Sequence, residues 1–408
     1  MDPAHPPGRL QEQLAELRRK IARMEARSPV VRFEAPASLN EGEEAANAAG
    51  VHWRMRRSWP SHFRHGNADV GALCELPPSL LDVLTEETGW SVPPERWAFV
   101  DTETSGLAGG SGTFAFLVGG GAITPDGFVV DQFFLREPAE EASQLEGFTE
   151  WLSGFDVMVT YNGRAFDIPL LETRYRLARM KPPFARLRHI DLLYSARRLW
   201  RLALERCRLQ DLEVRILGFE RVGDTPGALI PQLYFDFLRT GNARPLEGVF
   251  EHNALDILSL ACLAGIVPAA FRDPARLRSA AEMLGIARWL RNEQRFEEAL
   301  ALMREAVKRP LAEALLFETL WHMGDIERRL DRHDAAVALW SELSTVANPW
   351  RAQALERLAI HYEHRERNPA MALEMTRAAL AIAPSEALVK RLNRLQLRAN
   401  RPKSGRLL

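Results

Sequence analysis

The stretch Phe99-Val100-Asp101-Thr102-Glu103-Thr104-Ser105-Gly106 combines an apolar strand candidate with two carboxylates at its end. Side chains alternate between the two faces of a strand, so Asp101 and Glu103 point one way and Thr102 the other. Two like charges side by side repel each other unless a cation separates them, and a divalent metal ion is the natural solution. An Asp-x-Glu pair alone is weak evidence, because most such pairs are exposed strand ends or turns.

A second motif, Val159-Thr160-Tyr161-Asn162-Gly163-Arg164-Ala165-Phe166-Asp167, runs from an apolar strand through a tight turn into a helix. The helix is expected to begin near Asp167, and its N-terminus favours the ionised carboxylate. Taken alone, Asp167 is better explained as a simple helix N-cap.

A third motif, Glu251-His252-Asn253-Ala254-Leu255-Asp256-Ile257-Leu258-Ser259-Leu260, has the pattern of a helix. His252 and Asp256 are four residues apart and therefore lie one above the other on a single helix face. A carboxylate that holds metal and an imidazole one turn away suit the activation of water. The alternative is a surface His–Asp pair, which is common on helices.

Together the three motifs resemble the DEDD, or DnaQ-like, 3′–5′ exonuclease superfamily: an acid pair on the first strand, Asn-x-x-x-Phe-Asp, and a His or Tyr before a last helical Asp. Within it the chain is most similar to the YprB-like exonucleases of bacteria. Further stretches that carry the resemblance are His189-Ile190-Asp191-Leu192-Leu193, Leu209-Gln210-Asp211-Leu212-Glu213 with Ile216-Leu217-Gly218, and Pro226-Gly227 with Ile230-Pro231 and Tyr234.

The resemblance implies a site with two Mg²⁺ or Mn²⁺ ions held by Asp101, Glu103, Asp167 and Asp256. The implied substrate is nucleic acid, either DNA or RNA, which is cleaved from a single-stranded 3′ end. Thr102 and Asn162 are candidate substrate contacts, although Asn162 is equally suited to holding its turn. Asp191 is expected to cap a helix, or to contact a metal ligand without binding metal itself.

His252 is the one departure from the family pattern. Superfamily members with a catalytic histidine usually place it five residues before the last aspartate, whereas His252 precedes Asp256 by four, the interval of the tyrosine branch. The sequence therefore leaves open whether His252 is a general base, orients water, or acts through another residue.

The pattern around these motifs predicts an α/β domain with a mixed sheet flanked by helices. The resemblance implies that this domain is ribonuclease-H-like. Strands are expected at 98–100, 113–118, 128–135 and 157–160, and helices at 141–154 and 168–180. Gly109-Gly110-Ser111-Gly112 and Gly119-Gly120-Gly121 lack the spacing of a dinucleotide-binding loop and are interpreted as hairpin turns.

The segments before this domain are predicted to be mostly irregular. A short apolar seam from Leu10 to Met24 indicates a frayed helix or weak self-association, and 28–50 has the composition of a linker. In 51–69 Arg and His alternate with Trp and Phe, which suits stacking of bases or, equally, a pair of strands with arginines outward.

The C-terminal part is predicted to be all-α, with tetratricopeptide-like helical repeats. Phe296-Glu-Glu-Ala299-Leu300, His333-Asp-Ala-Ala336-Val337 and Pro369-Ala-Met-Ala372-Leu373 recur at a spacing close to thirty-six. Such arrays offer a concave face to a protein partner. The predicted organisation is an N-terminal helix and linker (1–50), a lead-in packed on the nuclease domain (51–96), the exonuclease domain (97–267), the repeats (274–400) and a basic tail (401–408).

Composition sets the remaining expectations. The net charge is −1, so any polyanion must meet local positive potential. Three distant cysteines without ligand spacing, no signal-peptide pattern and no apolar run of membrane-spanning length predict a cytoplasmic protein without a membrane partner. Two other functions fit the motifs: a weakly active or inactive nucleic-acid-binding scaffold that recruits a partner through the repeats, and a structure-specific endonuclease.

Overall fold

The computed structural model describes residues 42–85, 92–106 and 112–399. Within these residues the chain divides into two compact units: one takes the residues up to Arg197 and Arg206–Arg272, the other Arg198–Glu205 and the residues after Asp273. The expected helix at 10–24, most of the linker, Gly109 to Ser111 and the basic tail lie outside the described residues.

A seven-stranded mixed sheet forms the centre of the first unit, in the order β1-β2-β7-β6-β5-β8-β9. The pairs from β1 to β5 are antiparallel, and β5–β8 and β8–β9 are parallel. The strands are β1 (Gly42–Asn47), β2 (Gly50–Pro60), β5 (Trp97–Thr104), β6 (Ala115–Thr124), β7 (Gly127–Phe134), β8 (Val157–Thr160) and β9 (Arg188–Asp191). The predicted fold, a mixed sheet flanked by helices, is confirmed.

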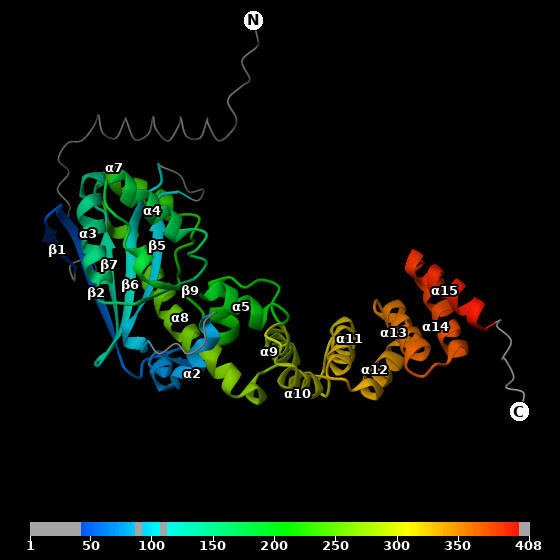
Figure 1. Cartoon of the computed structure of the whole chain (residues 1–408). Helices are drawn as coiled ribbons and strands as arrows, with labels where there is room; N and C mark the ends of the chain where they lie inside the picture. The colour runs from blue at the N-terminus through cyan, green and yellow to red at the C-terminus, as the bar shows by residue number, and fades with distance from the viewer. Residues whose placement is uncertain (1–41, 86–91, 107–111, 400–408) are drawn as a thin grey trace, which may run out of the picture. The chain divides into compact units, whose positions relative to one another are not determined.

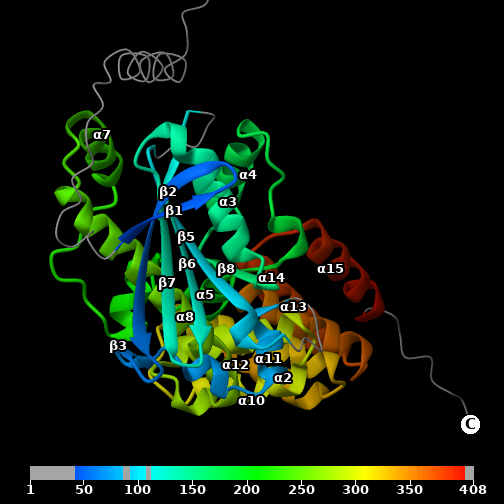
Figure 2. The same ribbon diagram turned by 90° about the vertical axis from the view of Figure 1, so that its left-hand side faces the viewer.

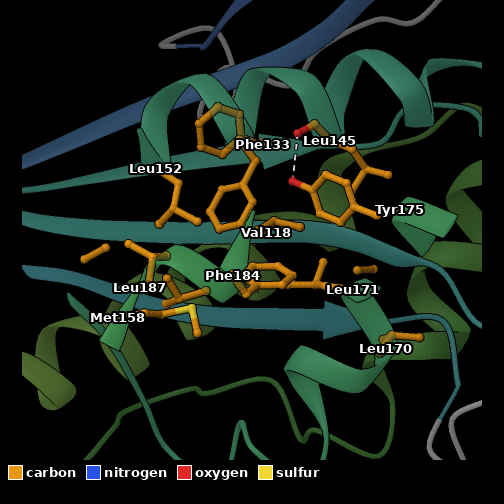
Figure 3. Close-up of a cluster of buried hydrophobic side chains, with 14 residues drawn as sticks. Val118, Phe133, Leu145, Leu152, Met158, Leu170, Leu171, Tyr175, Phe184 and Leu187 are labelled. Carbon is orange, nitrogen blue, oxygen red and sulfur yellow. Dashed lines mark hydrogen bonds between the residues drawn. The ribbon is translucent and has the colours of Figure 1, made fainter. Parts of the chain in front are cut away.

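Helices cover both faces of this sheet (Figures 1 and 2). On one face α3 (Glu141–Leu152) and α4 (Asp167–Leu177) pack through a buried apolar cluster that includes Val118, Phe133 and Tyr175. Figure 3 shows this cluster, in which the Tyr175 hydroxyl donates to the Leu145 carbonyl (2.9 Å). On the other face lie α7 (Ile230–Thr240) and α8 (Glu247–Arg272).

Shorter elements complete the first unit, and α5 (Leu192–Trp200) leads into the second. They are the β3–β4 hairpin (Arg64–His65 and Ala68–Asp69), α2 (Pro78–Leu81), α6 (Leu209–Leu212) and a π-helical segment (Glu213–Leu217). The hairpin packs close to that segment, since Asn67 N donates to the Leu217 carbonyl (2.6 Å).

The prediction of a linker at 28–50 was wrong for the last part of that range, which forms β1. The segment 51–96, predicted only to pack on the nuclease domain, contributes β2 to the central sheet. Glu43 to Asn47 pair with β2 as an edge strand, and β2 pairs with β7 inside the sheet. An edge strand needs backbone hydrogen bonds more than apolar side chains, so its polar composition resembles a linker. The arginine–aromatic stretch is therefore strand: Arg54 and Arg56 both donate to the buried carboxylate of Asp131.

The interpretation of Gly119-Gly120-Gly121 as a hairpin turn was also wrong, because all three lie in the middle of β6. Any Cβ added at Gly119 or Gly121 would overlap Ile257 of α8, and one added at Gly120 would overlap the Trp151 ring of α3. Helices therefore approach both faces of β6 more closely than side chains on the strand would allow.

Helix α8 has a further property that the sequence expectations missed. By length and composition the helical segment Arg244–Arg272, which contains α8, could cross a membrane, alone among the helices in the described residues. Yet 72% of its most apolar window is buried inside the protein. The expectation that no apolar stretch reaches that length was wrong. A helix that is packed between a sheet and its neighbours is apolar all round because it is a core helix.

The second unit consists of consecutive helices, each packed on the next: α9 (Ala280–Asn292), α10 (Phe296–Ala306), α11 (Glu313–Arg329), α12 (His333–Thr345), α13 (Arg351–His364), α14 (Pro369–Ile382) and α15 (Glu386–Ala399). The three motifs that recur in the sequence open α10, α12 and α14, and their alanines Ala299, Ala336 and Ala372 are fully buried. Gln294, Asp331 and Arg367 adopt a left-handed backbone conformation just before these helices. The helical repeat is thus present; its tetratricopeptide class stays a prediction.

Candidate active site

The acid pair of β5 faces helix α8, as the alternation of a strand requires. Asp101 Oδ2 accepts a hydrogen bond from Asn253 Nδ2 (2.8 Å), and Glu103 Oε1 lies 4.0 Å from His252 Nε2. Thr102, between them, points to the other face, where its hydroxyl donates to Asp167 Oδ1. One strand therefore holds parts of the site on both sides of the sheet.

Asp167 is the first residue of α4 and follows a turn that Asp191 holds in place. The Asp191 carboxylate accepts hydrogen bonds from the backbone N–H groups of Asn162 (2.7 Å), Arg164 (3.1 Å) and Leu193 (3.1 Å). Asn162 adopts φ +64°, a left-handed conformation that asparagine tolerates better than most residues. These contacts favour the turn-holding role for Asn162 and the capping role for Asp191 over direct substrate or metal contact.

Asp256 and His252 lie on one face of α8, with His252 Nε2 3.7 Å from Asp256 Oδ2. The other ring nitrogen, Nδ1, lies 2.8 Å from Oδ1 of Asp224. His252 thus lies between the carboxylate of Asp224, near Nδ1, and the carboxylates of Glu103 and Asp256, near Nε2. Asp224 could not be predicted as a site residue, because it lies in an irregular segment without a recognisable motif.

Burial and like charge dominate the electrostatics of this site. Burial raises the pKa of Asp101 well above its usual range, and the charges of Asp256, Asp167 and Glu103 raise it further. Burial, then Asp256 and Asp167, likewise raise the pKa of Glu103. Burial raises the pKa of Asp167 to about 6, although the Thr102 hydroxyl favours the ionised form. The four predicted carboxylates are therefore close enough to repel one another.

Arg221 is the main site residue that the sequence analysis missed. Its guanidinium, 6% exposed, donates to both carboxylate oxygens of Glu213 and to Oδ1 of Asp256. The residue lies in an irregular segment of an arginine-rich chain, so no local pattern sets it apart.

Asn253 was part of a quoted motif but had no assigned role. Its Nδ2 donates to Asp101, and its Oδ1 accepts from Gln132 Nε2 (2.8 Å) on β7. A Cβ at Gly119, which pairs with Asp101 across the sheet, would overlap this amide. The sequence signal for this arrangement was the glycine run, whose meaning depends on knowing which strand pairs with β5.

The donor set fits hard divalent cations in its chemistry, since carboxylate oxygens are the ligands that Mg²⁺ and Mn²⁺ prefer. The raised pKa values of Asp101, Glu103 and Asp167 point the same way, because a cation would relieve their repulsion. Among the described residues, however, no three His, Cys, Asp or Glu side chains are arranged to share one ion. The Arg221 guanidinium takes up one oxygen of Asp256 instead.

Comparison with known proteins identifies the family of the domain that holds these residues. A family model for the RNase H superfamily matches residues 98–267, a range that contains all four carboxylates. The chain is also 32% identical over 290 residues to the uncharacterised protein YprB of Bacillus subtilis. The aligned region covers 70% of this chain and 69% of that protein. Membership of the superfamily indicates a nuclease-like function that involves nucleic acid and divalent ions. The chain belongs to the RNase H superfamily, in the family of YprB.

Proposed function

We propose that this protein is a divalent-metal-dependent phosphodiesterase that shortens single-stranded nucleic acid from its 3′ end. The observation that carries the proposal is the gathering of Asp101, Glu103, Asp167 and Asp256 from β5, α4 and α8 into one cluster, in which burial and like charge raise the pKa of Asp101 and Glu103. The 3′ direction rests on the resemblance of the motifs to DEDD exonucleases.

In this proposal the four carboxylates hold two Mg²⁺ or Mn²⁺ ions. Such ions make water nucleophilic at neutral pH and neutralise the charge on the departing oxygen. The chain supplies the positioning: Asn253 orients Asp101, while Thr102 and the turn pinned by Asp191 orient Asp167.

The contacts of His252 support a role as proton acceptor. With Nδ1 hydrogen-bonded to Asp224, the imidazole has its Nε2 aimed at the cluster between Glu103 and Asp256. A carboxylate that holds the Nδ1 proton leaves Nε2 free to accept one from an attacking water, as in other carboxylate–histidine pairs. We propose His252 as the general base and Asp224 as the residue that fixes its tautomer.

The test uses the full chain with Mn²⁺ and a 5′-labelled single strand of DNA or RNA. The wild type is expected to give a ladder that shortens from the 3′ end, and Asp101→Asn to lose roughly a thousandfold in rate or more. Asp236→Asn is the matched control, since Asp236 is an exposed residue of α7 paired with Arg239. Equal rates for wild type and Asp101→Asn would refute the proposal. A circular single strand should stay intact, and its cleavage would assign an endonuclease instead.

A further inference from the structure

A buried cation stands inside the carboxylate cluster. Nε and Nη2 of Arg221 donate to the two oxygens of Glu213 at 2.8 and 2.5 Å, and Nη2 also donates to Asp256 Oδ1. On its other side, Nη1 lies 3.6 Å from Asp224 Oδ2 and 3.2 Å from His252 Nδ1. One guanidinium thus serves three carboxylates, one of which is a proposed metal ligand.

The two ends of this arrangement differ in how firmly they are held. Glu213, 1% exposed, lies in the π-helical segment and also accepts a hydrogen bond from the Ser259 hydroxyl (2.5 Å). Ser259 in turn contacts His65 Nε2 (2.8 Å) of the β3–β4 hairpin. Arg221 is therefore anchored through Glu213 to the hairpin and to α8. Asp256, on the opposite side, faces the cluster of like charges.

This asymmetry lets Arg221 give up one partner without losing its place. When Asp256 turns to a divalent ion, the guanidinium keeps its two-pronged pair with Glu213 and its proximity to Asp224. The ion, in contrast, cannot use Asp256 Oδ1 while Nη2 is bound to it. Arg221 and the ion therefore compete for the same oxygen.

We infer that Arg221 is an internal counter-ion of the metal site: it pairs with Asp256 Oδ1 and must release this oxygen before a divalent ion can use it. The inference rests on the proposed function, because it assumes that Asp256 is a ligand. The competition lowers the affinity of the site for metal, while the pairing offsets part of the negative charge of the acid cluster.

The experiment titrates the full chain with Mn²⁺ by calorimetry and measures thermal unfolding with and without Mn²⁺. Arg221→Gln is expected to bind Mn²⁺ about tenfold more tightly, since the competitor is gone. Its metal-free melting temperature should fall by several degrees, because removing one partner leaves buried carboxylates unpaired. Saturating Mn²⁺ should then raise the melting temperature more than in the wild type.

Arg174→Gln is the matched control. Arg174 is a similarly buried arginine of the same unit that pairs through two bonds with Glu141, away from the four carboxylates. Its replacement should lower the melting temperature without changing the Mn²⁺ affinity. If Arg221→Gln does not fold, Arg221→Lys serves, since lysine keeps the charge but cannot donate to Glu213 and Asp256 with a planar fork. A smaller gain in affinity, about threefold, is expected there.

The outcomes separate this inference from the proposed function. Unchanged or weaker Mn²⁺ binding in folded Arg221→Gln, next to a binding wild type, would overturn the inference and leave the metal site standing. Mn²⁺ binding by Arg221→Gln alone would support it strongly. Absence of binding in both proteins would sink both proposals.

Discussion

Carboxylates are buried in both units of this chain, and their surroundings differ. In the helical repeats Glu363 is 1% exposed in its side chain and pairs with Arg391 (2.6 Å), Arg394 (2.8 Å) and Arg398 (3.1 Å). In the candidate site of the sheet unit, the charges that act most strongly on Asp101 and Glu103 are those of other acids, above all Asp256 and Asp167. Glu363 thus has three cations for one carboxylate, whereas the candidate site has more carboxylates than cations.

The pKa values follow this difference. Burial raises the pKa of Glu363, but hydrogen bonds and charge from Arg394 and Arg391 outweigh it and leave the pKa below its usual value. In the sheet unit, burial and like charge act together and raise the pKa of Asp101 and Glu103. Buried acids that are matched by cations hold a fold together, whereas a surplus of unmatched acids marks a place for a ligand.

The largest effect on stability is expected for Glu363→Gln. The change leaves three arginines of α15 without their shared carboxylate, and because Arg394 and Arg398 are about half exposed we expect a loss of about 2 kcal/mol in unfolding free energy. Glu363 has a lowered pKa, so its contribution is present above its unfolded pKa and is lost only as the pH falls through the folded value. Denaturant unfolding at pH 7.5 measures it, and an unchanged midpoint would remove the contrast between the units.

The next effect is the pH dependence of Mn²⁺ binding. Because burial raises the pKa of Asp167 to about 6, this acid gains a proton as the pH falls through 6 and loses its ability to bind metal. The pKa values of Asp101 and Glu103 are raised as well, which adds to the loss at acidic pH. The Mn²⁺ affinity should fall about tenfold from pH 6 to pH 5, or about 1.4 kcal/mol. Calorimetric titrations in buffers of different protonation enthalpy should show proton release, and a pH-independent affinity would contradict the raised values.

The smallest effect is expected for Asp101→Asn without metal. An acid with a raised folded pKa stabilises the fold below its unfolded pKa, and this stabilisation is lost as the pH rises through the folded pKa. At pH 7.5 the amide removes the repulsion from Asp256, Asp167 and Glu103, so we expect about 1 kcal/mol of added stability. Denaturant unfolding in the presence of a chelator measures this gain. A loss as large as that of Glu363→Gln would mean that Asp101 is a structural acid.

The sequence alone predicted what depends on local pattern. Strand alternation placed Asp101 and Glu103 together and Thr102 opposite, and helical spacing placed His252 above Asp256. The starts of α10, α12 and α14 coincide with the recurring motifs. These features could be predicted because they depend on periods of two, 3.6 or about thirty-six residues along one chain segment.

The tertiary structure alone decided what depends on which segments meet. The need for glycine at position 119 follows only from the pairing of β6 with β5 and the close approach of α8. The polar segment β1 is likewise recognised as an edge strand only from its pairing with β2. Arg221 and Asp224 carry no pattern at all, yet they reach Asp256 and His252 from an irregular segment. Charge pairing between distant segments leaves no periodic trace in the sequence, because one guanidinium in the right place suffices and its neighbours along the chain are free to vary.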